Sequence, residues 1–138
     1  MTEAESPLAA ALAQVGDRWK LHIIDALLVG PARFSDLEHV IEGISTNILS
    51  SRLKDLEQEG VVIAEAYSER PPRYQYALTA PGKELAGALH LLADWGARHG
   101  DEPSSSPRHE LCGTPLEVRW YCPTCGVTTD GTDPMWHV

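Results

Sequence analysis

The chain has 138 residues, of which 43% are hydrophobic, and this suits one compact domain plus a small appendage. The first twenty residues hold no apolar run behind a basic start, and no stretch approaches the roughly 18 apolar residues that span a bilayer. We therefore expect a cytoplasmic protein with no membrane partner. The net charge of −9 argues against bulk, nonspecific nucleic-acid binding but leaves room for a local basic patch.

Start and stop residues divide the first thirty positions into two short helices. Ser6 followed by proline is typical of a helix start, and that helix should run to about residue 15, where a glycine follows. Asp17 can cap a second helix, predicted over 18–29 and ended by a Gly-Pro pair. Its apolar stripe consists of Trp19, Ile23, Ala26 and Leu27.

Two more helices follow before the first strand. A capping box at 35–38, which begins at Ser35, opens the third helix. Ser45 caps the fourth helix, which should run to about residue 59 and end at a glycine. The buried stripe of this fourth helix is formed by Leu49, Leu53 and Leu56, which fall within a sector of about 60°.

The next segment predicts a hairpin and a last helix. Strands are expected over 61–67 and 73–78, separated by a polar turn that contains two prolines. A last helix is expected over 81–98, with Leu85, Leu89, Leu92 and Trp95 on one side. The chain thus predicts a mainly α fold with a small β-hairpin (α+β class), a linker at 100–107 rich in serine and proline, and a separate segment at 108–138.

Short helices followed by a hairpin are the element order of a winged helix-turn-helix, so the fourth helix would be the recognition helix. The side opposite its leucines is polar, with small residues near its N-terminus, as insertion into a major groove requires. Asn47 is the best candidate for a base contact, because asparagine pairs bidentately with adenine. Arg52 and Lys54 are candidates for phosphate contacts. The alternative is that this polar face is simply solvated.

The hairpin turn carries an arginine on each side of its proline pair, which suits a wing that reaches the DNA backbone or the minor groove. Between residues 43 and 83 the chain has five basic and five acidic residues, so the DNA hypothesis depends on where the charges lie and not on their number. The predicted DNA contacts are Ser45, Thr46, Asn47, Ser50, Ser51, Arg52, Lys54, Arg70 and Arg73.

All three cysteines lie within the last thirty residues, and clustered cysteines in a reducing compartment more often bind metal than form disulfides. His109 and Cys112 form one pair, Cys122 and Cys125 form a second, and each pair has two residues between its members and a glycine after it. One histidine with three cysteines is a common tetrahedral zinc set. We expect one zinc ion per chain, in a structural role because a filled site leaves no open position.

Other interpretations of the cysteine segment stay open. His137, His99 or water could replace His109 as the fourth ligand, and iron could replace zinc. Sensing of zinc or an oxidant is a further alternative, since thiolate ligands are labile and oxidisable. The cysteines could also be free thiols in a flexible tail. In the alternative from another functional class, this segment is the active part of a protein-interaction or redox module.

Several segments between residues 6 and 96 resemble, in the same order, the HxlR-type winged-helix family, which is related to the MarR-type regulators. The matching segments are VGDRWKL (15–21), GPARFSDL (30–37), GISTNILSSRLKDLE (43–57), PPRYQYALT (71–79) and DWG (94–96). The cysteine segment resembles a zinc ribbon or rubredoxin-type knuckle.

The family resemblance implies a bacterial transcription regulator, with DNA binding and dimerisation in residues 1–99. It implies a homodimer built on the first and last helices, binding to a two-fold DNA operator, and it leaves room for a small-molecule effector. Many relatives begin with Cys-Pro, and in some that cysteine senses oxidants, whereas this chain has Ser6-Pro7, which cannot act as a thiol switch. No nucleophile with a base, phosphate loop or paired catalytic carboxylates is recognisable, so we expect no enzyme activity.

Overall fold

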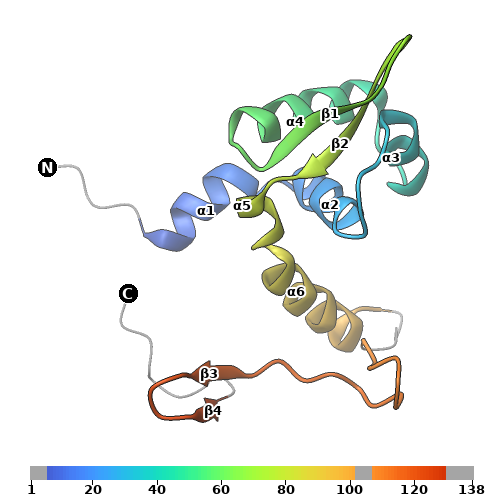
Figure 1. Ribbon diagram of the computed structural model, residues 1–138. Helices are drawn as coiled ribbons and strands as arrows, with labels where there is room; N and C mark the ends of the chain where they lie inside the picture. Colours follow the sequence, from blue (N-terminus) through green and yellow to red (C-terminus); the bar gives the residue numbers. More distant parts are fainter. Residues whose placement is uncertain (1–5, 102–106, 130–138) are drawn as a thin grey trace, which may run out of the picture. The chain divides into compact units, whose positions relative to one another are not determined.

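The computed structural model describes residues 6–101 and 107–129, so most of the predicted linker lies outside the described residues. The chain divides into two compact units, the first ending at Leu89 and the second beginning at His90. In chain order, the first unit contains α1 (Pro7–Val15), α2 (Arg18–Leu27), α3 (Phe34–Val40), α4 (Thr46–Gln58), β1 (Val62–Glu69), β2 (Pro72–Leu78) and α5 (Ala80–Lys83) (Figure 1). Helix α6 (Ala86–His99) crosses the division, and the second unit continues with β3 (Trp120–Cys122) and β4 (Val127–Thr129).

Three of the predicted helix caps are confirmed. The hydroxyl of Ser6 accepts a hydrogen bond from the N–H of Ala9 at 3.1 Å, and the hydroxyl of Ser45 accepts one from the N–H of Ile48 at 3.2 Å. Asp17 accepts from the first two backbone N–H groups that follow residue 18, at 3.0 and 3.1 Å. Each cap satisfies N–H groups that have no partner inside the helix.

The predicted start of the third helix is wrong. Ser35 does not cap it, because α3 begins one residue earlier, at Phe34. The carboxylate of Asp36 accepts a hydrogen bond from the backbone N–H of Arg33 at 3.0 Å. This bond back to the N-cap residue fixes the first turn of α3.

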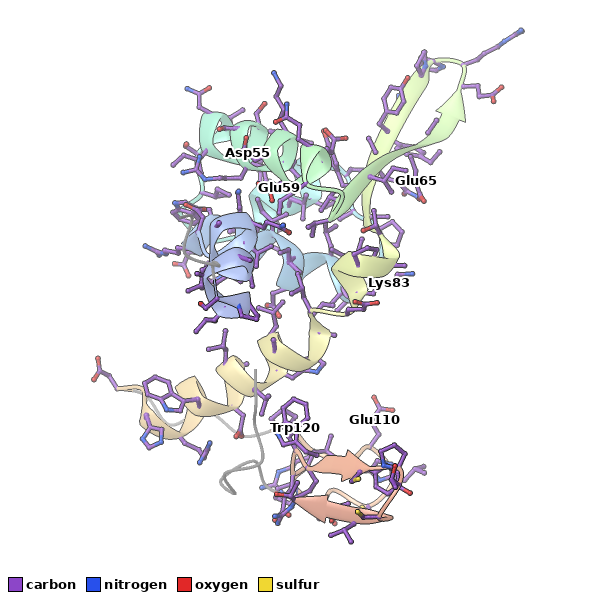
Figure 2. The ribbon with its side chains drawn as sticks, turned by 90° about the vertical axis from the view of Figure 1, so that its left-hand side faces the viewer. Asp55, Glu59, Glu65, Lys83, Glu110 and Trp120 are labelled. Atoms are coloured by element: carbon purple, nitrogen blue, oxygen red, sulfur yellow. The ribbon has the colours of Figure 1, made fainter. Side chains whose placement is uncertain are left out.

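Lys20 of α2 is buried, with only 8% of its surface exposed. Its ammonium donates to the carbonyl of Gln14 at 3.0 Å and lies 3.9 Å from the carboxylate of Glu59, which Figure 2 labels at the end of α4. A buried cation needs such partners to offset its lost hydration. Lys20 therefore links the last turn of α1 to the end of α4.

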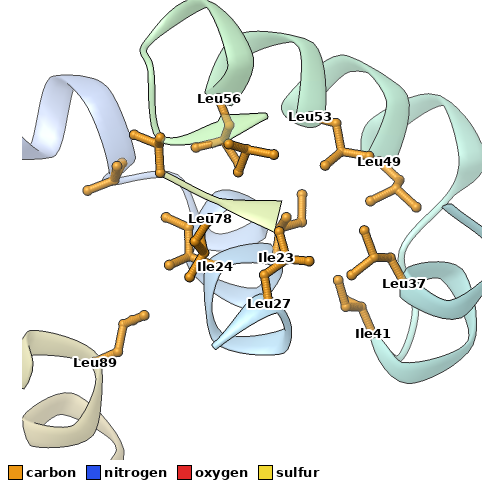
Figure 3. Packing of buried hydrophobic residues seen from close by; sticks show 13 residues of the cluster. Ile23, Ile24, Leu27, Leu37, Ile41, Leu49, Leu53, Leu56, Leu78 and Leu89 are labelled. Carbon is orange, nitrogen blue, oxygen red and sulfur yellow. The ribbon is translucent and has the colours of Figure 1, made fainter. Parts of the chain in front are cut away.

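The core of the first unit lies between α2, α3, α4 and the base of the hairpin (Figure 3). Each helix contributes one apolar stripe, and the opposite side of each helix stays in solvent. The largest fully buried side chains are Ile23, Ile24, Leu37, Leu49, Leu53 and Leu56. The predicted leucine stripe of the fourth helix is confirmed, and it fixes which face of α4 points outward.

Strands β1 and β2 form an antiparallel hairpin that starts with Val62 opposite Leu78. Both strands extend further toward the turn than predicted, so the turn between them contains fewer residues than the predicted polar segment. Ala32 joins the hairpin by exchanging two backbone hydrogen bonds with Tyr76, of 2.9 and 2.7 Å. This bridge anchors the hairpin beside the start of α3.

The last predicted helix is not continuous. Helices α5 and α6 are separated at Glu84 and Leu85, where the N–H of Leu85 bonds the carbonyl of Gly82, three residues back instead of four. Gly82 is buried so close to the carbonyl of Val61 that a Cβ atom would collide with it. The packing of α5 against the start of β1 interrupts the helix. No helix in the described part of the chain is long and apolar enough to cross a membrane.

Candidate nucleic-acid interface and cysteine turns

The outward face of α4 is polar and open to solvent. Leu49, Leu53 and Leu56 are at most 1% exposed, so the residues on the opposite side of the helix face away from the core. These exposed residues are Thr46, Asn47, Ser50, Ser51, Lys54 and Gln58. The side chains of Asn47 and Ser50 have no hydrogen-bond partner within residues 6–101 and 107–129, so their polar groups are available to a ligand.

The first residues of α4 are held by internal bonds. The hydroxyl of Ser45 is used in capping the helix. The hydroxyl of Thr46 donates to the carboxylate of Glu38 at 2.7 Å, which braces the start of α4 against α3. These two predicted DNA-contact residues therefore position the helix in the absence of DNA, while Asn47 next to them stays unpaired.

Arg52 is half-buried and turned toward the protein. Its Nε donates to the carboxylate of Asp17 at 3.0 Å, and its Nη1 donates to the hydroxyl of Ser51 at 3.4 Å. Burial raises the pKa of Asp17, but the hydrogen bonds from Arg52 and from the backbone outweigh it and hold that pKa below its ordinary value. Arg52 thus ties α4 to the cap of α2, and its predicted phosphate contact stays a prediction.

The hairpin presents its arginines to solvent, since Arg70 and Arg73 are both exposed. Arg33, which is not among the predicted DNA contacts, lies near Arg73. An open hollow of about 390 Å³ between the hairpin and the start of α3 is lined by Arg33, Phe34, Ser35, Tyr67, Arg73 and Tyr74. It brings two arginines and two tyrosine side chains to one surface, a composition that suits a phosphate backbone.

Arg33 is held in place by Asp36. The guanidinium forms two bonds to that carboxylate, of 3.2 and 3.4 Å, and they lower the pKa of Asp36. In the sequence, Arg33 is marked only as a cation directly before a helix start. Its position beside the hairpin depends on the backbone bridge between residues 32 and 76, which local sequence patterns do not reveal.

A second hollow of about 600 Å³ lies beside α2 and α3. Its lining mixes charges of both signs with apolar side chains: Arg18, His22, Asp25, Ala26, Val29, Val40, Ile41 and Glu42. This volume is in the range of small-molecule sites. The sequence leaves room for a small-molecule effector, and this hollow is one candidate place for it.

The predicted metal ligands form two separate pairs. The Nδ1 atom of His109 lies 3.4 Å from the sulfur of Cys112, and the N–H of Cys125 donates to the sulfur of Cys122 at 3.4 Å. Within residues 6–101 and 107–129, no three histidine, cysteine or acidic side chains are gathered into one metal-holding group.

The three cysteines are free thiols, and one in each pair, Cys112 and Cys122, has its pKa lowered. A hydrogen bond with the hydroxyl of Thr114 lowers the pKa of Cys112, and the N–H of Cys125 lowers that of Cys122. Of the alternative fourth ligands, His99 packs its ring on Trp95 with centroids 5.1 Å apart, and His137 lies outside the described residues.

The model of the HxlR-like helix-turn-helix family matches residues 14–104, about two thirds of the chain. The chain belongs to the HxlR family. The family consists of transcription regulators and not of enzymes, and DNA is their general partner. The helix-rich α+β fold with its small antiparallel hairpin agrees with this assignment.

Relatives and solved structures support the assignment. The HTH-type transcriptional regulator Rv3095 of Mycobacterium tuberculosis, itself uncharacterised, is 37% identical over 127 residues, which cover 90% of this chain and 79% of the relative. The redox regulator HypR in its oxidized form is 28% identical, with a TM-score of 0.66 over 70% of this chain and 100% of HypR. The crystal structure of PA1607, a candidate transcription factor, covers 98% of this chain and 96% of its own, with 26% identity and a TM-score of 0.79.

Proposed function

We propose that this HxlR-type protein is a cytoplasmic, homodimeric regulator that binds a two-fold operator sequence. The observation that carries the proposal is the outward face of α4, where Asn47 and Ser50 are exposed and unpaired opposite a fully buried leucine stripe. A recognition helix uses such residues near its N-terminus to read base edges. The exposed arginines of the hairpin would fix the register through phosphate contacts.

Apolar residues exposed on two helices support the homodimer. On α1, Leu8 and Leu12 are 68% and 56% exposed, and on α6, Leu92 and Trp95 are 57% and 60% exposed. Exposed apolar groups of this kind are typical of surfaces that another chain covers. A two-fold dimer would present two copies of α4 to two half-sites of one operator.

The test is a mobility-shift titration with the purified protein on the DNA upstream of its own gene, beside a scrambled duplex of equal length. We expect tight binding to the first duplex alone, with a strong dependence on salt concentration. Equal binding to both duplexes, or binding to neither by a folded protein, would contradict a sequence-specific regulator of that region.

Zinc is proposed to have a structural role in this regulator, and a sensing role is the second candidate. The similarity to the redox regulator HypR and the thiolate-favouring surroundings of Cys112 and Cys122 favour sensing. DNA affinity measured before and after a chelator or mild peroxide separates the two roles. A zinc ion that only stabilises its own segment predicts unchanged affinity, and a sensor predicts a large change.

A further inference from the structure

The C-terminal segment builds the same backbone turn twice. The N–H of Gly113 bonds the carbonyl of His109 at 2.7 Å, and the N–H of Gly126 bonds the carbonyl of Cys122 at 2.8 Å. Both glycines have nearly equal positive φ, +69° and +67°, a conformation that side-chain-bearing residues rarely adopt. Two segments with different sequences therefore fold into one common turn, each with a predicted metal ligand at its first and fourth positions.

Each turn is closed at its base by extended backbone. Arg108 and Pro115 form an antiparallel bridge around the first turn, and the N–H of residue 109 bonds the carbonyl of Thr114 at 2.9 Å. Strands β3 and β4 flank the second turn, with Cys122 opposite Val127. Two such turns, each with two ligands, can supply the four ligands of one tetrahedral ion.

The spacing inside the first pair also fits zinc. Zinc–nitrogen bonds of about 2.0–2.1 Å and zinc–sulfur bonds of about 2.3 Å place an N and an S ligand of one tetrahedron roughly 3.5 Å apart. The observed distance from His109 Nδ1 to Cys112 Sγ is 3.4 Å. In the second pair the backbone N–H of Cys125 points at the sulfur of Cys122, an outer bond of the kind that orients a thiolate ligand.

Within residues 107–129 no apolar side chain is buried, so no core of these residues holds the turns together. Its large apolar side chains remain open to solvent, with Leu111 90% exposed, Tyr121 63% and Val127 59%. Trp120, which Figure 2 labels in this hairpin, is 46% exposed. An isolated two-stranded hairpin is marginally stable in water, so another interaction has to fix the segment.

We propose that His109, Cys112, Cys122 and Cys125 bind one Zn²⁺ ion, and that this binding folds the segment 107–129. Because the two pairs are not gathered into one group in the described residues, the ion must draw the two turns together. Four protein ligands leave no open coordination position, so the ion stabilises structure and performs no catalysis. The binding free energy then becomes folding free energy of the segment. None of these steps depends on DNA binding.

The experiment uses Co²⁺ as a coloured probe in the full-length, metal-stripped protein. We expect one Co²⁺ to bind per chain. Its visible absorption bands should be those of a tetrahedral site, with thiolate-to-cobalt charge-transfer bands from three sulfurs. Added Zn²⁺ should displace the Co²⁺. Cys112→Ser should lower the charge-transfer intensity by about a third, and His109→Ala should weaken binding by roughly a hundred-fold or more. His99→Ala is the matched control and should change neither value.

Backbone amide NMR spectra read out the folding step. Amides of residues 107–129 should spread over a wider frequency range when Zn²⁺ is added, while those of residues 6–89 should stay in place. Absence of stoichiometric Co²⁺ binding would overturn the site. Retention of the full signal by His109→Ala, with loss in His137→Ala, would overturn the ligand set. A spectrum of residues 107–129 that zinc leaves unchanged would overturn metal-coupled folding.

Discussion

The carboxylate of Asp17 lies 3.0 Å from the Nε atom of Arg52, which joins the cap of α2 to the middle of α4. The same carboxylate accepts the N–H groups of Trp19 and Lys20, so one side chain both caps α2 and orients α4. About a third of each partner's side chain remains exposed, at 34% and 29%, so solvent weakens the pair. Its main consequence is geometric, because it fixes the direction of Arg52 relative to the predicted DNA-contact residues of α4.

Asp17→Ala should lower the free energy of unfolding by about 1–3 kcal/mol, because it removes a helix cap together with a partly exposed ion pair. Asp17→Asn should cost less, since asparagine also caps helices and only the charge is lost. Urea unfolding followed by circular dichroism measures both variants. A loss in Asp17→Asn as large as in Asp17→Ala would assign the effect to the ion pair instead of the cap.

Stability should fall on acidification, with Asp17 as a contributor. Its pKa in the folded protein lies below the ordinary value of 3.8, so the stabilisation is fully present above that value. It is lost as the pH falls from there through the lowered pKa, because the unfolded chain takes up the proton first. Urea midpoints between neutral and acidic pH should fall less steeply in Asp17→Asn than in the wild type.

Asp36→Asn is the matched control for this pH dependence. The pKa of Asp36 is lowered in the same direction by Arg33, but both side chains are largely exposed, at 46% and 53%. Its removal should therefore change the acid slope less than Asp17→Asn does. A pH dependence of Asp17→Asn identical to that of the wild type would contradict the role assigned to this carboxylate.

Asn47→Ala should weaken binding to the operator by about 1–3 kcal/mol and relax the sequence preference at one base pair, as expected for a lost bidentate contact. Gln58→Ala, on the same helix face but in the last turn of α4, is the control and should bind as the wild type does. Titrations against operator duplexes with single base changes provide both values. Unaltered affinity and preference in Asn47→Ala would remove this residue from base reading.

Arg73→Ala should weaken binding to all sequences alike and reduce the slope of log affinity against log salt by about 0.9, the value for one lost phosphate contact. Arg33→Ala should act in the same way if the hollow between the hairpin and the start of α3 touches the DNA backbone. Lys83→Ala, an exposed cation on α5, is the control. A selective loss on the operator alone would mean that Arg73 reads bases instead of phosphates.

Local patterns predicted the elements and the exposed face of α4, because helical periodicity and capping residues act over a few positions. They did not reveal the partner of Arg52, which lies 35 residues earlier in the chain. They also missed the break before α6, since it depends on the close approach of Gly82 to Val61 across the fold. Arg33 was missed for the same reason, because a tertiary bridge places it beside Tyr67 and Arg73.

The homodimer can be tested by placing a charge on the proposed contact surface. Leu12→Asp puts a carboxylate on the exposed apolar face of α1, where a partner would have to bury it, so the dimer should dissociate. Sedimentation equilibrium should report a monomer, and affinity for the two-fold operator should fall steeply because half of the contacts are lost. Binding to a single half-site duplex should change little.

Val29→Asp is the matched control, since Val29 is 94% exposed and belongs to neither α1 nor α6, the two proposed contact helices. It likewise replaces an exposed aliphatic side chain by a carboxylate, and it should leave both the mass and the operator affinity at wild-type values. Circular dichroism confirms that each variant is folded. A dimeric Leu12→Asp, combined with a monomeric variant carrying Trp95→Asp, would restrict the interface to α6, and dimers in both variants would contradict the proposed surface.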